Sequence, residues 1–228
     1  MTWHLGARGF PFILSRMKLY NYFRSSASYR VRIAMALKGL DYEYIPVHIA
    51  KGEHLREPFS TMAADRLVPL LEVDGLKLAQ SMAIIEFLDE THPDVPLLPP
   101  DAIGRAQVRA LAQCIACDTH PVTNLRILKY LTQELKVDDA AKNAWYVRWC
   151  REGLEAFERQ LEGLPKATYC FGETPTLADC CLVPQIFNAQ RFKVSLDGLP
   201  RLTAAYEAAA ALPAFKQAHP SACPDFEA

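Results

Sequence analysis

The sequence predicts a two-domain fold in which a small α/β domain precedes an all-helical domain. Three observations predict it: β-rich runs alternate with a helical pattern early in the chain, four prolines then cluster in residues 93–100, and only helical patterns follow. A length of 228 residues suits two small domains. We expect the α/β domain at residues 17–93, a stiff linker at 94–101 and the helical domain at 102–228.

The first domain opens with a strand and a helix. Residues 18–22 read as a short strand, and Ser25 and Ser26 then introduce a helix that Gly39 ends. One face of this helix carries apolar residues at helical spacing, namely Tyr29, Ile33, Ala36, Leu37 and Leu40. Residues 42–47 return as a β-rich run. This order predicts a β-α-β unit with parallel strands.

A hairpin and a helix complete the domain. Residues 67–73 are apolar but contain Pro69, which removes a backbone donor and argues against a central strand there. Asp74-Gly75 predicts a tight turn between strands at 70–73 and 76–79. Ser81 then opens a helix with a polar N-cap residue. A β-α-β unit followed by an antiparallel hairpin and a helix is a thioredoxin-like arrangement.

The second domain shows helical spacing throughout. Three helices are indicated by the apolar sets Val108, Leu111, Ala112 and Ile115; Leu125, Leu128, Leu131 and Leu135; and Leu154, Phe157 and Leu161. Residues 204–212 are alanine-rich and predict another helix. Thr176 and Asp179 have the spacing of a capping box, so we assign Asp179 to helix capping rather than to general-base catalysis.

Composition excludes several classes of protein. Half the residues are hydrophobic, 22% are charged and the net charge is −1, so the chain has no bulk attraction for nucleic acid or an anionic membrane. No apolar run is long enough to span a bilayer. Seven scattered cysteines suit a reducing, cytoplasmic compartment better than a disulfide framework. Cys114 and Cys117 form a C-x-x-C without a second pair, so we expect packing and no metal site.

The first sixteen residues are treated separately. They precede a second methionine, Met17, at which the clear strand pattern begins. Their apolar run is shorter than the core of a signal peptide, and no small-residue cleavage site follows it. We therefore expect residues 1–16 to be a leader or an added extension, and the folded domain to start at Met17.

Three short segments could bind a ligand, and two of them suit an anion. Ser25, Ser26 and Ser28 cluster between a strand end and a helix start, where free N–H groups and the helix dipole favour negative charge, although a plain N-cap and turn is the alternative. A cis peptide at Val68-Pro69 would turn backbone groups toward a peptide-like ligand, and a trans proline at a strand edge is the alternative. Gln80-Ser81 at a second helix start suits a carboxylate. The sequence has no nucleotide-binding glycine motif, and the serines have no His or acid at hydrolase spacing.

Several segments resemble the zeta class of the glutathione S-transferase family. They are "YNYFRSSASYRVRIAMALKGLDYEYIPV", "LVPLLEVDG", "QSMAIIEFLDE", "NLRILKYL" and "TPTLADCCLVPQIFNAQRFKV", and the resemblance spans Met17 to about Phe226. It implies a glutathione transferase fold, a homodimer, and glutathione as cofactor. It also implies cis–trans isomerisation of a maleyl diacid in aromatic catabolism, in which the glutathione thiolate adds to the double bond, the single bond rotates, and the thiolate leaves.

The resemblance also implies roles for individual residues. Ser25 and Ser26 match the thiol-activating serines, which would lower the pKa of the glutathione thiol. Glutathione-binding positions are matched by His54, Val68, Pro69, Gln80, Ser81, His120 and Asn124. Two departures concern Ala27, where the class usually has cysteine, and residues 62–65, where the usual Asn-Pro is missing. The second departure bears on the geometry of the loop before Val68.

Three arginines are candidates for binding the diacid. A guanidinium binds a carboxylate through two parallel hydrogen bonds, and Arg24, Arg126 and Arg191 lie beside the matched motifs. Arg24 adjoins the serine pair, so we count it with the catalytic residues as well. Arg30 and Arg32 are also near, but their place within a helix favours a structural role.

Several alternatives stay open at this stage. Maleylacetoacetate is the expected substrate, and maleylpyruvate of the gentisate pathway is the alternative, because both share the maleyl end and both end in a carboxylate. The same site could instead conjugate glutathione to electrophiles or dehalogenate small haloacids, although arginines suit a diacid better than a broad apolar pocket would. A non-catalytic binding module of the same fold is a further alternative. Glutathione binding without turnover would distinguish it.

Overall fold

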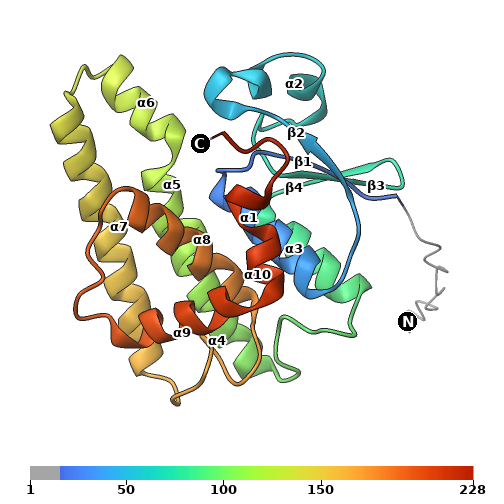
Figure 1. The fold of residues 1–228 in the computed structure, drawn as a ribbon, viewed down its shortest axis with the longest axis vertical. Helices are drawn as coiled ribbons and strands as arrows, with labels where there is room; N and C mark the ends of the chain where they lie inside the picture. The colour runs from blue at the N-terminus through green and yellow to red at the C-terminus, as the bar shows by residue number, and fades with distance from the viewer. Residues whose placement is uncertain (1–15, 228) are drawn as a thin grey trace, which may run out of the picture.

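A computed structural model describes residues 16–227 of the chain (Figure 1). The leader predicted at residues 1–16 lies outside the described residues except for Arg16. The first part contains β1 (Lys18–Asn21), α1 (Ser26–Leu37), β2 (Glu43–Pro46), α2 (Phe59–Met62), β3 (Leu70–Val73), β4 (Leu76–Ala79) and α3 (Ser81–Thr91). These elements confirm the predicted thioredoxin-like order of strands and helices.

The four strands form one mixed sheet in the order β2-β1-β3-β4. β1 is parallel to β2 and antiparallel to β3, so Leu19 lies opposite Tyr44 on one side and Leu71 on the other. The hairpin between β3 and β4 turns at Asp74 and Gly75, whose φ angles are 50° and 79°. Positive φ at both turn residues is what a type I′ hairpin requires, as the Asp-Gly pair predicts.

Both helices that face the sheet begin at predicted sites, but their caps differ. Ser25 is the N-cap of α1, and its Oγ accepts a hydrogen bond from the Ser28 N–H at 3.3 Å. Helix α3 begins at Ser81, as predicted, but the expected polar cap is not made: Gln80 occupies the N-cap position, with φ of 70° and no side-chain cap bond. Ser81 is the first residue of the helix, and its hydroxyl accepts a hydrogen bond from Arg30.

The second part of the described chain is helical. Its elements are α4 (Ala102–Gln113), a π-helix (Cys114–Thr119), α5 (His120–Thr123), α6 (Leu125–Gln133), α7 (Asp139–Glu162), α8 (Leu177–Arg191), α9 (Pro200–Ala211) and α10 (Pro213–Ala218). Leu135 departs from the predicted α6 pattern, because the helix ends at Gln133 and the Leu135 side chain is exposed. We keep the domain limits near residues 93 and 102 as a proposal.

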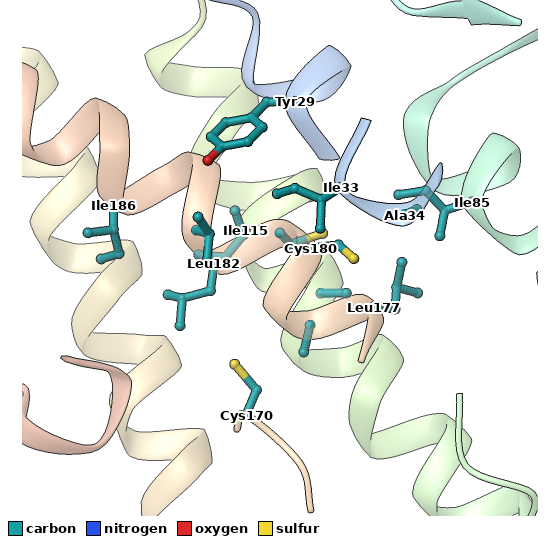
Figure 2. Close-up of a cluster of buried hydrophobic side chains, with 14 of the residues drawn as sticks. Tyr29, Ile33, Ala34, Ile85, Ile115, Cys170, Leu177, Cys180, Leu182 and Ile186 are labelled. Carbon is teal, nitrogen blue, oxygen red and sulfur yellow. The ribbon is translucent and has the colours of Figure 1, made fainter. Parts of the chain in front are cut away.

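Helix α8 joins the two parts through a common core. It runs beside α1, and Figure 2 shows Ile33 and Ala34 of α1 facing the cluster that contains Cys180, Leu182 and Leu177 of α8. All five side chains are fully buried. The same two helices also meet between the start of α1 and the end of α8, where the polar residues of the site lie.

The start of α8 is fixed by the predicted capping box. Thr176 accepts a hydrogen bond from the backbone of α8, and Asp179 reaches back to the Thr176 N–H at 2.7 Å. Asp179 also accepts from the Thr176 hydroxyl at 2.9 Å and from the Cys170 N–H at 2.9 Å. Asp179 is fully buried and makes only these structural bonds, which supports the assignment to capping.

Candidate active site

Two adjoining cavities lie where the sheet-containing part meets the helices. The large cavity has a volume of about 680 Å³ and the small cavity about 160 Å³, and Ser25, His120 and Asn124 line both. The large cavity is also lined by His54, Val68, Pro69, Gln80, Ser81 and Arg126. The small cavity is also lined by Arg24, Ser26 and Arg191. All twelve site residues proposed from the sequence therefore border one continuous region.

Of the serine pair, Ser25 lines both cavities and Ser26 lines the small one. Ser26 is buried, and its Oγ accepts a hydrogen bond from Asn188 Nδ2 at 2.5 Å. Asn188 Oδ1 in turn accepts from Arg191 Nη1 at 3.1 Å. Because the Ser26 oxygen accepts from Asn188, its own hydrogen is free to donate to an anion. The network orients the hydroxyl from α8, on the opposite side of the site.

Asn188 was not identified from the sequence. It lies three residues before Arg191, so both side chains emerge from neighbouring turns of α8 on the same face. That spacing was a usable signal, but it had meaning only once Arg191 was known to face Ser26. The contact crosses 162 positions of the chain, which no local pattern reveals.

The small cavity is strongly cationic. Arg24 and Arg191 line it, and no Asp or Glu is among the described residues that do. Burial and the neighbouring Arg24 guanidinium lower the pKa of Arg191. The Arg24 guanidinium lies 5.6 Å from the centre of the Phe23 ring and 5.9 Å from that of Tyr22. Two guanidinium groups without a carboxylate partner in the cavity make it a site for an anion with more than one negative charge.

The floor of the large cavity contains a buried arginine. Arg30 is 2% exposed, and its Nη1 donates to Ser81 Oγ at 3.3 Å. Its Nε and Nη2 are buried and have no hydrogen-bond partner in the part of the chain that the structure describes. The structural role expected for Arg30 is thus incomplete, whereas Arg32 is fully used in hydrogen bonds to the backbone of Phe23 and Ala218 and to Asn21. Unpaired guanidinium nitrogens favour an acidic ligand next to Ser81.

Other polar groups line the rim of the large cavity. The Val68–Pro69 peptide is cis, as predicted, despite the missing Asn-Pro. Gln80 Nε2 donates to Asp65 Oδ2 at 3.1 Å, so Asp65 fixes the orientation of the Gln80 amide. His54 Nδ1 is buried and has no hydrogen-bond partner among residues 16–227, and burial, followed by Lys129, lowers the pKa of His54. The cavity thus offers donors at both ends and extended backbone between them.

His120 stands at the junction of the cavities. It follows the π-helix directly, and its Nε2 lies 3.4 Å from Asn124 Nδ2. Burial, then Arg30 and Arg126, lower the pKa of His120 to about 3. The imidazole is therefore neutral at working pH, and it presents one donor and one acceptor rather than a charge.

The depressed pKa of His120 makes stability depend on pH. The unfolded chain, with an ordinary histidine pKa, binds more protons than the folded chain between pH 3 and 6.5, so stability falls as the pH falls through this window. We expect His120→Gln to remove this contribution, which is about 2 kcal/mol between pH 7 and pH 5. Urea unfolding at both pH values measures it. An equal loss of stability in wild type and variant would contradict the assignment.

The described residues contain neither a metal-binding cluster nor a membrane-spanning helix. Among residues 16–227, no group of three or more His, Cys, Asp or Glu side chains could hold a metal ion. All seven cysteines are free, including Cys114 and Cys117. Within the same residues, no helix has the length and hydropathy needed to cross a bilayer.

Two family models match the chain. The glutathione S-transferase N-terminal domain matches residues 15–90, and the glutathione S-transferase C-terminal domain matches residues 140–208. The matches together cover more than half of the sequence, the first over the sheet-containing part and the second within the helical part. The chain belongs to the glutathione S-transferase family.

Its relatives narrow the class. A maleylpyruvate isomerase from a Ralstonia species is 50% identical over 210 residues, which are 92% of this chain and 99% of that protein. A holo structure of a maleylpyruvate isomerase, described as a zeta-class bacterial glutathione S-transferase, has a TM-score of 0.90 at 49% identity, covering 92% of this chain and all of that one. A maleylacetoacetate isomerase from Anaeromyxobacter dehalogenans, solved with dicarboxyethyl glutathione and citrate, has a TM-score of 0.84 at 42% identity, covering 94% and 99%. These similarities confirm the zeta-class resemblance seen in the sequence.

Proposed function

We propose that the protein is a glutathione-dependent cis–trans isomerase of a maleyl diacid, with maleylacetoacetate or maleylpyruvate as substrate. One observation carries the proposal: a small cavity, lined among the described residues by two arginines and by no acid, opens at Ser25 into a larger cavity with donors for a peptide-like ligand. The names of the relatives support the reaction type.

The residues of the large cavity fit glutathione, a tripeptide with a carboxylate at each end. Gln80 and Ser81 would hold the γ-glutamyl carboxylate, and Arg30 donates to Ser81 from behind. The negative charge of this carboxylate would also compensate the buried guanidinium of Arg30, two of whose nitrogens are unpaired among the described residues. Val68 would pair with the cysteinyl backbone. His54 and Lys129 line the other part of the cavity and would face the glycine carboxylate. When bound, glutathione would supply a thiolate nucleophile.

The protein's own groups would make that thiolate available. Ser25 and Ser26 lie at the start of α1, where the helix dipole favours an anion. The Ser26 hydroxyl, oriented by Asn188, can donate its hydrogen toward sulfur. A free thiol has a pKa near 8.5, so hydrogen bonds to the ionised form increase the reactive fraction at neutral pH.

The small cavity would hold the diacid. Arg24 and Arg191 would each bind a carboxylate or the enediolate oxygen that carries charge during the reaction. Arg126 lies on the large cavity, near His120, and would reach a carboxylate only toward that side. The same arginines would bind either substrate, because maleylacetoacetate and maleylpyruvate share the maleyl end. The two substrates therefore stay alternatives. We further propose that the protein is a cytoplasmic homodimer, as its family membership suggests.

The test is a direct assay of both substrates by ultraviolet absorbance, with and without glutathione. We expect the protein to turn over at least one of the two diacids, and we expect this activity to disappear when glutathione is omitted. The diacid that is turned over faster is the preferred substrate. No turnover of either diacid, with glutathione still bound, would move the assignment to conjugation, dehalogenation or a binding role. A chloronitrobenzene and a haloacid, tested in parallel, separate these three outcomes.

A further inference from the structure

The last described residues of the chain, 223–227, lie against the loop between β1 and α1 (Figure 1). We refer to them as the tail segment. Asp225 Oδ2 accepts a hydrogen bond from the Phe23 N–H at 3.3 Å, and its other oxygen accepts from the Tyr44 hydroxyl. Glu227 pairs with His48 Nε2 at 3.3 Å and with Lys51. These contacts join positions more than 170 residues apart in the sequence.

The tail segment completes a clamp on this loop. On the inner side, the buried Arg32 donates to the Phe23 carbonyl at 2.8 Å and to the Tyr22 carbonyl at 3.4 Å. On the outer side, Asp225 accepts a hydrogen bond from the Phe23 N–H. Both backbone groups of Phe23 are therefore held, one by α1 and one by the tail segment. The next residues along the chain are Arg24 and Ser25.

The clamp extends to the side chain of Arg24. The Phe226 ring meets the Phe23 ring edge-on, with centroids 5.6 Å apart and an interplanar angle of 82°. The Arg24 guanidinium lies 5.6 Å from the centre of the same Phe23 ring. Phe226 is 44% exposed, so more than half of its surface is covered by neighbouring groups. Phe226, Phe23 and Arg24 thus form a continuous row from the tail segment to the small cavity.

We propose that the tail segment positions Arg24 for the diacid, with Asp225 and Phe226 as positioning residues. Neither residue lines the small cavity, so both act through the loop. The inference rests on the proposed function, because Arg24 matters in this way only if the small cavity binds a dicarboxylate. A guanidinium held on an aromatic face loses less conformational freedom on binding than a free one, so removal of the tail contacts should weaken binding of the diacid alone.

Two ligands separate the diacid from the rest of glutathione. Dicarboxyethyl glutathione carries two additional carboxylates on the substituent of its sulfur, whereas the ethyl substituent of S-ethylglutathione carries none. Isothermal titration calorimetry on the full chain gives the affinity ratio of the two ligands. We expect Phe226→Ala to lower this ratio about tenfold and to leave S-ethylglutathione binding unchanged. Phe226→Tyr keeps the ring and should restore the ratio.

Further variants make the test independent of folding. Asp225→Asn and a chain that stops after Pro224 should act in the same direction as Phe226→Ala. Val95→Ala is the matched control, because Val95 is exposed to the same 44% and lies away from the site. In an Arg24→Ala background, Phe226→Ala should produce no additional loss.

The outcomes are distinct. A ratio that is unchanged by Phe226→Ala and Asp225→Asn, in a wild type that does prefer the dicarboxylate, would overturn the inference and leave the proposed function intact. Equal weakening of both ligands would also overturn it, because the tail segment would then only stabilise the fold. A wild type without preference for the dicarboxylate would overturn the proposed function itself, and the inference with it.

Discussion

Arg191→Ala is expected to lower kcat/KM for the diacid by about 100- to 1,000-fold, a range typical for loss of one preorganised group that stabilises developing charge. Two effects combine. The small cavity would lose one of its two guanidinium groups, and no other described cation lines it apart from Arg24. Asn188 would also lose the donor that fixes its amide, so the Ser26 hydroxyl would lose its orientation.

Matched variants separate these two effects. Arg191→Lys retains charge but not the planar fork, and should recover only part of the activity. Asn188→Ala leaves the arginine in place, and should raise the pKa of the bound glutathione thiol, measured by thiolate absorbance, while the KM for the diacid changes little. Arg148→Ala, on an exposed pair with Glu152, is the control and should retain full activity. Full activity of Arg191→Ala would show that the diacid binds elsewhere.

Local features of the fold could be predicted because each rests on neighbouring residues. The Asp74-Gly75 turn, the Ser25 cap and the Thr176–Asp179 capping box depend on side chains within a few positions of one another. The site residues were found for a different reason. They were identified through the motifs of a family resemblance, and the structure brings all twelve to the two adjoining cavities.

The features that were missed depend on contacts between distant segments. Arg30 was assigned to structure because its helix position gave no sign that two of its nitrogens would lack partners beside Ser81. Asn188 and Asp225 bond to partners 162 and 202 positions away. Leu135 fits the α6 pattern in the sequence, but the helix ends before it. Periodicity predicts which face of a helix is apolar, and does not predict where the helix stops or which distant group it meets.

Asp179→Ala is expected to cost about 3–4 kcal/mol of the free energy of unfolding, the largest loss of stability that we predict for a single substitution. Loss of an N-terminal cap costs about 1 kcal/mol, and each buried donor left without a partner adds about 1 kcal/mol or more. The fully buried Asp179 carboxylate accepts hydrogen bonds from the Thr176 N–H, the Thr176 hydroxyl and the Cys170 N–H. Thermal unfolding should shift downward by about 10 °C.

The same substitution tests how the site depends on α8. Asp179→Asn keeps one oxygen acceptor and should lose roughly half as much stability. Asp139→Ala is the matched control, because Asp139 begins α7 with a side chain that is 85% exposed, and its loss should be about 0.5 kcal/mol or less. Because α8 also carries Asn188 and Arg191, the Asp179→Ala protein should lose isomerase activity at temperatures below its unfolding midpoint. Unchanged stability would mean that the packing of α8 against α1, rather than its cap, determines where the helix begins.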